Sequence, residues 1–424
     1  MFALPKLLTW CCVLSFISSA CTIEPTTGQF SMEIVGLSKN KPAAYELREV
    51  GVNKSPELLA QENQEFIFLS KIKIAQKQLA HAALVSSSFD HMRYLLQKNI
   101  TGHPIIPIYS NTNQVFRANT FESLLAMSAF YHFDQIRKFA DKLKLLEDPH
   151  DQLALRVGIY GEIFMSSFDI LPVVSNDNAV YIGSADVIAL LPVGSSQGLP
   201  MSMNEGILAH EYHHRLFFNQ VWVNNSNNQR WKRYQARYNK SKQLSVTRTH
   251  ILLAATDEAL ADLFAIAFTG VVDFMTVSLT TPKGNLINKQ RDLRGNFANL
   301  VTYDDLANEK LRPEFRLYCP AKSKNFTNSK FNIYCLATII AKVFFEASEQ
   351  EIYKLANIAI PLAHKALPLI GKVLEKNKSY DLELFFDAVA RESKKLDPIF
   401  HRKFCAELAK RFRSLYLSGL SSCD

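Results

Sequence analysis

Short apolar runs bounded by turn residues predict strands in the first half of the chain. Residues 171–174, 179–182 and 187–191 form three such runs, with turn-forming residues at 175–178 and a glycine at position 183 between them. Residues 105–109 predict a further short strand. We therefore expect a mixed or antiparallel sheet in the N-terminal part of the protein.

Apolar residues at helical spacing predict helices elsewhere. Thr120 can cap a helix whose apolar face carries Leu125, Ala129, Phe133 and Ile136, and residues 55–99 also read as a long helical pattern. After residue 201 the pattern is helical to the end, apart from polar loops at 222–245 and 281–330. The expected fold class is α+β, with an all-helical C-terminal subdomain.

The first residues predict an export signal. Residues 1–20 contain one positive charge, an apolar run at 7–17 and small residues before Cys21. The segment resembles a bacterial lipobox, which implies a lipid anchor on Cys21, and ordinary cleavage after Ala20 is the alternative. No later run is long and apolar enough to span a bilayer. We expect an exported protein, either lipid-anchored in the bacterial cell envelope or secreted.

Composition narrows the class of protein. The 424 residues are 48% apolar and carry a net charge of +8, which excludes disordered, collagen-like and coiled-coil chains. The charges are spread along the sequence, so no nucleic-acid partner is expected, and we expect a monomer.

The predicted organisation is an export signal at 1–21, an N-terminal extension at 22–100, an α+β catalytic subdomain at 101–217 and a helical subdomain at 218–424.

Four cysteines lie outside the signal and its lipobox. In an exported chain they suggest two disulfides. Of the three possible pairings we favour the local one, which joins Cys319 to Cys335 and Cys405 to Cys423. Each bond would close a short loop and contribute about 3 kcal/mol in the chain-entropy account.

The residues that indicate chemistry begin at Ser202, which has capping-box spacing to Glu205 and predicts a helix start. On that helix His210 and His214 are four residues apart, so both imidazoles can reach one zinc ion. Glu211 lies on the adjoining side, where its carboxylate can contact a water molecule beside the metal. His213 is an alternative partner for His210 at a spacing of three.

A second helix, expected at 251–268 and ending at Gly270, provides the remaining ligand. A catalytic zinc usually has three protein ligands, and Glu258 can be the third. Asp262 lies one turn further on, where it can accept the second N–H of a ligating histidine. Both acids sit among apolar residues, and a buried carboxylate requires a partner.

These motifs resemble those of the thermolysin-like zinc peptidases, which place two histidines on one helix and Glu-x-x-x-Asp on the next. The resemblance covers residues 101–350 and implies a zincin fold, with the active-site helix between a sheet-containing and a helical subdomain. It also extends to Asn178-Ala179-Val180-Tyr181. In the family this strand segment binds the substrate backbone, which implies that Asn178 and Ala179 hold an extended peptide.

The chain also departs from that family. The connection between His214 and Glu258 is long and basic, and Phe326 stands where the family has a histidine that stabilises the oxyanion. Arg294 is our candidate electrophile in its place. Unassigned alternatives to Arg294 are Tyr234, Tyr238 and His364.

The predicted function is an exported zinc metalloendopeptidase that hydrolyses peptide or protein substrates. Two alternatives remain open. One is a catalytically degenerate zincin-fold envelope protein with a binding or structural role. The other is a helical lipoprotein in which the motif arose by chance and binds no metal.

Overall fold

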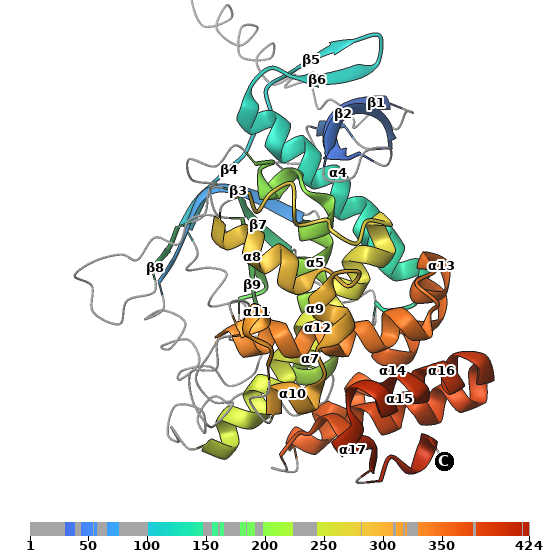
Figure 1. Ribbon diagram of the computed structural model, residues 1–424. Helices are drawn as coiled ribbons and strands as arrows, with labels where there is room; N and C mark the ends of the chain where they lie inside the picture. The colour runs from blue at the N-terminus through green and yellow to red at the C-terminus, as the bar shows by residue number, and fades with distance from the viewer. Residues whose placement is uncertain are drawn as a thin grey trace, which may run out of the picture.

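The computed structural model is a sheet-containing part joined to a helical part, with the helices α5 and α7 at their junction (Figure 1). It describes residues 30–38, 44–53, 55–56, 66–75, 101–146, 155–159, 162–164, 179–183, 185–190, 198–223, 244–280, 282–307, 311–316, 319, 330–375, 379–417 and 419–423.

In the part of the chain that the structure describes, ten strands form two sheets. They are β1 (Phe30–Leu37), β2 (Tyr45–Val52), β3 (Phe66–Ala75), β4 (Thr101–Pro104), β5 (Tyr109–Thr112), β6 (Val115–Ala118), β7 (Leu155–Ile159), β8 (Glu162–Phe164), β9 (Ala179–Ile182) and β10 (Val187–Leu190). The smaller sheet has the order β2-β1-β6-β5, and the larger has the order β4-β3-β7-β10-β9 with β8 paired to β3. In the larger sheet β9 is antiparallel to β10 and forms one edge of the described strands.

The helices account for most of the rest of the described chain. They are α4 (Phe121–Lys142), η2 (Met201–Met203), α5 (Glu205–Phe218), η3 (Asn219–Val223), α7 (Leu244–Thr269), α8 (Pro282–Arg291), α9 (Asn296–Leu300), α10 (Tyr303–Ala307), α11 (Pro313–Arg316), α12 (Lys330–Ala347), α13 (Ile352–Lys354), η5 (Leu355–Ala359), α14 (Ile360–Glu375), α15 (Leu382–Leu396), α16 (Pro398–Arg411), α17 (Arg413–Leu417) and η6 (Ser421–Cys423).

The core runs through both parts without interruption. On the sheet side, Phe66 and Phe68 of β3 pack against Phe133 of α4. On the helical side, α7 is rich in buried apolar residues and packs between α5 and α12, as expected for a central helix. The helices α14 to α17 gather at the far end of the molecule (Figure 1). The pairing of α5 with α7 therefore lies where the two parts meet.

Several sequence expectations are confirmed. The chain is α+β with a helical C-terminal region. Thr120 caps α4 by accepting a hydrogen bond from the Ser123 main-chain N–H, and the predicted strands at 179–182 and 187–191 correspond to β9 and β10. Gly270 follows the last residue of α7 with a φ of 75°, the left-handed conformation expected after a helix end.

The predicted helix at 55–99 is wrong over Phe66–Ala75, which forms strand β3. This segment pairs with β7 on one side and β4 on the other, and pairing of that kind outweighs a local helical pattern. The strand expected at 105–109 is also misplaced. Only Tyr109 belongs to a strand, β5, because Pro107 has no main-chain donor for strand pairing.

The predicted loop at 281–330 contains four helices, α8 to α11, and the start of α12. Two of the short helices bury a single large side chain each, Phe297 in α9 and Phe315 in α11. One large buried side chain per helix leaves no periodic pattern to detect in the sequence.

No described helix has both the length and the apolar character that a membrane crossing requires. Cys21 and the rest of the predicted export signal lie outside the described residues. The lipid anchor therefore stays a prediction.

Both predicted disulfides are present. Cys319 is bonded to Cys335 and Cys405 to Cys423, with Cα atoms 6.2 and 5.6 Å apart. The second bond ties the C-terminal turn η6 to α16.

Replacement of Cys405 and Cys423 together by serine should lower the free energy of unfolding by about 3 kcal/mol, because the unfolded chain regains the freedom of a closed loop. Denaturant unfolding of oxidised wild type and the double variant measures the difference. An unchanged unfolding midpoint would contradict this account of the bond.

Candidate metal centre

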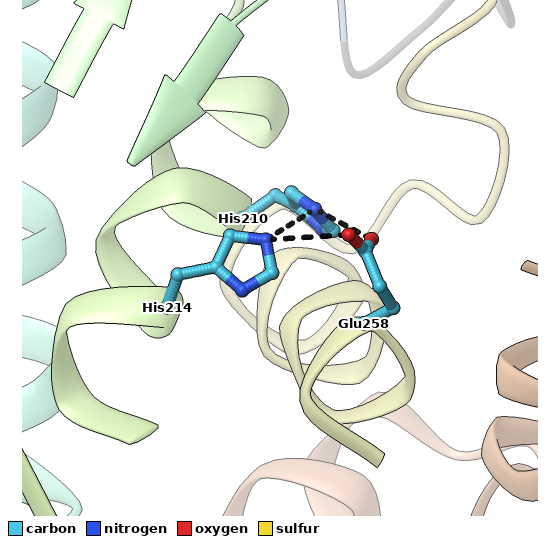
Figure 2. Close-up of side chains that lie close together, drawn as sticks. All are labelled: His210, His214 and Glu258. Carbon is cyan, nitrogen blue, oxygen red and sulfur yellow. Dashed lines mark hydrogen bonds and ion pairs between the residues drawn. The ribbon is translucent and has the colours of Figure 1, made fainter. Parts of the chain in front are cut away.

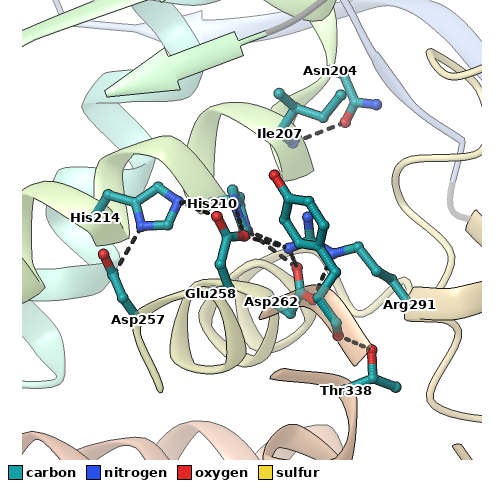
Figure 3. A network of polar contacts seen from close by, with 10 residues as sticks. Asn204, Ile207, His210, His214, Asp257, Glu258, Asp262, Arg291 and Thr338 are labelled. Atoms are coloured by element: carbon teal, nitrogen blue, oxygen red, sulfur yellow. Dashed lines mark hydrogen bonds and ion pairs between the residues drawn. The ribbon is translucent and has the colours of Figure 1, made fainter. Parts of the chain in front are cut away.

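Asn204 fixes the start of α5. Its side-chain oxygen accepts hydrogen bonds from the main-chain N–H groups of Gly206 and Ile207 at 3.0 and 3.2 Å (Figure 3). Its side-chain amide donates to the Phe274 carbonyl at 2.8 Å, which holds the helix start against the turn after α7. Ser202, predicted as the cap, instead lies in the short helix η2. A carboxamide can cap and donate at the same time, which a serine hydroxyl does less well.

Helices α5 and α7 bring His210, His214 and Glu258 together (Figure 2). The two histidine Nε2 atoms are 3.0 Å apart. Glu258 places one carboxylate oxygen 3.3 Å from His210 Nε2 and the other 3.9 Å from His214 Nε2. All three ligand atoms lie within 4.8 Å of one another.

This donor set fits a metal ion in both chemistry and spacing. Ligand atoms bound to a tetrahedral zinc at about 2.0–2.1 Å lie about 3.3–3.4 Å from one another. The 3.0 Å between the two imidazole nitrogens and the 3.3 Å from His210 Nε2 to Glu258 Oε2 are close to that value. Two imidazoles and a carboxylate can therefore hold a metal ion here with small side-chain movements.

Each histidine of the centre has its own second carboxylate (Figure 3). His210 Nδ1 lies 3.1 Å from Asp262 Oδ1, and His214 Nδ1 lies 2.8 Å from Asp257 Oδ1. Asp262 is thus where the sequence placed it, and Asp257 is the corresponding partner of His214. With both Nδ1 atoms facing carboxylates, both Nε2 atoms are directed toward the common point.

Arg291 of α8 neutralises part of this negative charge. Its guanidinium donates to both Asp262 oxygens, at 2.9 and 2.5 Å, and to Glu258 Oε2 at 3.0 Å. Arg294, the predicted electrophile, is not brought to the centre, since it is exposed beyond the end of α8. Its main-chain N–H donates a hydrogen bond to the Asp292 side-chain carboxylate. The arginine at the centre is therefore Arg291, three residues earlier.

Burial and charge shift the ionisation of these groups in opposite directions. Burial disfavours the anion, yet Arg291 and the two histidines hold the pKa of Glu258 well below its ordinary value. Burial lowers the pKa of His214, but Asp257 and the nearby glutamates outweigh it and raise that pKa to about 10. In the metal-free protein, His214 therefore carries a proton at neutral pH, and metal must displace it.

Glu211 lies between the cluster and the edge strand. Burial raises the pKa of its carboxyl group, while His214 and His210 lower it. The Tyr181 main-chain N–H of β9 also donates to this carboxylate. A glutamate with a raised pKa beside the ligand atoms can both accept and return a proton.

Tyr334 is a neighbour of the site that the sequence did not reveal. The Arg291 guanidinium carbon lies 5.0 Å from its ring centroid. The negative charge of Glu258, followed by burial, raises the pKa of the Tyr334 hydroxyl. The Gln290 side-chain amide donates to Cys335 Sγ at 2.8 Å. Gln290 directly precedes Arg291, and Cys335 directly follows Tyr334, so the Cys319–Cys335 disulfide lies beside both residues. Tyr334 follows the polar segment predicted as a loop, and no spacing linked it to Glu258.

His213 does not join the cluster. Its Nε2 atom lies 2.9 Å from His364 Nε2, and His364 Nδ1 lies 2.9 Å from the Gln220 side-chain oxygen. Both histidines are buried, His213 on α5 and His364 on α14. The choice of His214 over His213 agrees with this geometry, and His364 is not at the centre.

Of the remaining predicted residues, the structure describes Ala179, which lies in β9. Ala179 is the first residue of that edge strand and is buried. Asn178 lies outside the described residues, as do Tyr234, Tyr238 and Phe326. Their roles stay predictions.

No protein-family model and no curated protein matches the chain. The case for a metal centre therefore rests on the residues themselves. Two histidines and a glutamate converge, two aspartates orient the histidines, and an arginine joins the carboxylates.

Asp257→Asn should reduce the number of protons released on zinc binding at pH 8 by about one per metal ion. In the wild type, Asp257 helps to raise the pKa of His214 to about 10, so the imidazole is protonated at pH 8 and the incoming metal displaces a proton. Without the aspartate, burial is opposed only by the nearby glutamates, so the pKa of His214 falls and the metal displaces fewer protons. Titration calorimetry in two buffers of different ionisation enthalpy measures the release.

The matched control is Asp141→Asn, at an exposed aspartate near the end of α4. Its proton release should equal that of the wild type. Equal release by wild type and Asp257→Asn would show that Asp257 does not set the protonation of His214.

Proposed function

We propose that the protein is an exported zinc-dependent metalloendopeptidase. The observation that carries the proposal is the convergence of His210, His214 and Glu258 with Glu211 beside them on α5. A bound zinc ion would supply Lewis acidity, polarising a peptide carbonyl and making water a better nucleophile at neutral pH.

Glu211 is the proposed proton carrier. Its raised pKa suits a group that takes a proton from the attacking water and returns it to the leaving amine. The hydrogen bond from the Tyr181 main-chain N–H orients the carboxylate. The same strand, β9, can pair with an extended peptide along its outer edge, which would carry the scissile bond past Glu211.

Tyr334 is the proposed donor to the oxyanion. Its hydroxyl group responds to the charges of Glu258 and Glu211, so it shares their surroundings. The raised pKa keeps the hydroxyl protonated and able to donate. Arg291 is engaged by Asp262 and Glu258, so we assign it to holding these carboxylates.

A second function, as a catalytically degenerate zincin-fold protein with a binding or structural role, is favoured by one observation. The arginine nearest the ligands is committed to two carboxylates, and the predicted electrophile Arg294 is exposed. In this case the centre would bind zinc without hydrolysing peptides.

Glu211→Gln should retain zinc and lose casein cleavage by about 100- to 10,000-fold, because the neutral amide cannot accept the proton. Cleavage of a labelled casein by zinc-loaded protein and elemental analysis of the same samples measure both quantities. Glu346→Gln, at a half-buried glutamate of α12 paired with Lys342, is the control and should cleave at the wild-type rate.

Cleavage by Glu211→Gln at the wild-type rate would exclude Glu211 as the proton carrier. A zinc-replete wild type that cleaves neither casein nor any member of a broad peptide library would instead support the degenerate binding protein.

A further inference from the structure

The turn between β9 and β10 contains a fully buried aspartate in an uncommon conformation. Asp186 has a φ of 51° and no exposed surface. A left-handed backbone conformation is uncommon for residues other than glycine. A buried carboxylate is also costly in free energy without a charged partner. Such a residue persists only where surrounding contacts hold it.

Two side chains hold Asp186. Arg215 of α5 binds it with two hydrogen bonds, from Nε to Oδ1 at 2.9 Å and from Nη2 to Oδ2 at 3.0 Å. The Tyr181 hydroxyl of β9 donates to Oδ1 at 2.9 Å. Arg215 directly follows His214, so adjacent residues of one helix contact the metal centre and the turn.

A steric contact fixes the same turn at a second point. A Cβ atom on Gly183 would lie 2.3 Å from the ring of Phe218, which is one turn after Arg215 on α5. The ring of Tyr181 packs edge-on against Phe218, with centroids 6.1 Å apart. The absence of a side chain at position 183 is what allows the turn to lie against the helix.

These contacts determine where the edge strand lies relative to Glu211. Tyr181 donates its main-chain N–H to Glu211 and its hydroxyl to Asp186, so one residue joins the strand to both. Arg215 and Glu211 belong to the same helix, which makes the distance between them rigid. In the part of the larger sheet that the structure describes, β9 has a neighbour on one side only.

We propose that Asp186, Arg215 and Tyr181 form a clasp that positions β9 as the binding edge for an extended peptide substrate. The clasp sets the position of the bound peptide backbone relative to Glu211, and it acts on substrate binding without contributing to metal binding. These are positioning residues, and the inference rests on the proposed peptidase function.

Arg215→Lys tests the clasp with little loss of charge, because lysine keeps the cation but cannot bind the carboxylate at two points. We expect KM for a fluorogenic peptide to rise about 10- to 100-fold and kcat to change less than threefold. Zinc affinity, measured by chelator competition, should stay within about threefold of the wild type. Hydrogen exchange of the zinc-loaded protein should be faster in β9 and β10.

Gly183→Ala provides a second variant that leaves the ion pair intact. It should raise KM similarly by pushing the turn away from Phe218, and adding Phe218→Leu should restore much of the wild-type KM by making room. Arg411→Lys is the matched control, since Arg411 is a buried arginine that pairs with Glu407 in α16, away from β9. It should lower stability and leave KM unchanged.

Unchanged KM and unchanged exchange in Arg215→Lys would overturn the proposal, as would an equal rise in KM in Arg411→Lys. Failure of the proposed function has a different signature, because the zinc-loaded wild type would then cleave no peptide. In that outcome the substrate role of the clasp falls as well, while the exchange data still show whether it holds β9.

Discussion

The balance of buried charge between α5 and α7 is the constraint on which the centre depends. Four carboxylates, those of Glu211, Asp257, Glu258 and Asp262, meet here, and the Arg291 guanidinium binds two of them, Glu258 and Asp262. Carboxylates in such a setting must be protonated, paired or bound to a cation. Two imidazoles directed at the same point can take up protons or share a divalent ion. The arrangement therefore favours occupation by a metal over an empty cluster.

The fold is organised to hold this charge in place. Asn204 fixes the first turn of α5 against the chain that follows α7, so the histidine helix and the glutamate helix are joined at one end. At the other end of α5, Arg215 reaches the sheet. Most of the described part of α7 is buried, and its acidic residues Asp257, Glu258 and Asp262 contact the histidines of α5 or Arg291. Stability and site geometry thus depend on the same pair of helices.

Much of the centre could be predicted because it depends on spacing within single helices. Residues four apart on a helix lie on the same face. His210 and His214 have this spacing, and so do Glu258 and Asp262. What could not be predicted depends on contacts between distant segments. Arg291 and Tyr334 lie on α8 and α12, and their side chains reach the cluster because α12 packs on α7 and α8 packs on α12. Arg294 was chosen in place of Arg291 because sequence distance does not show which of two nearby arginines faces inward.

The most direct measurement of the central claim is the zinc content of purified protein equilibrated with a small excess of zinc and then dialysed. The account predicts about one zinc ion per chain in the wild type and in His364→Ala, whose histidine lies outside the cluster, and almost none in His210→Ala. A wild type without stoichiometric zinc, or a His210→Ala protein that retains it, would contradict the account.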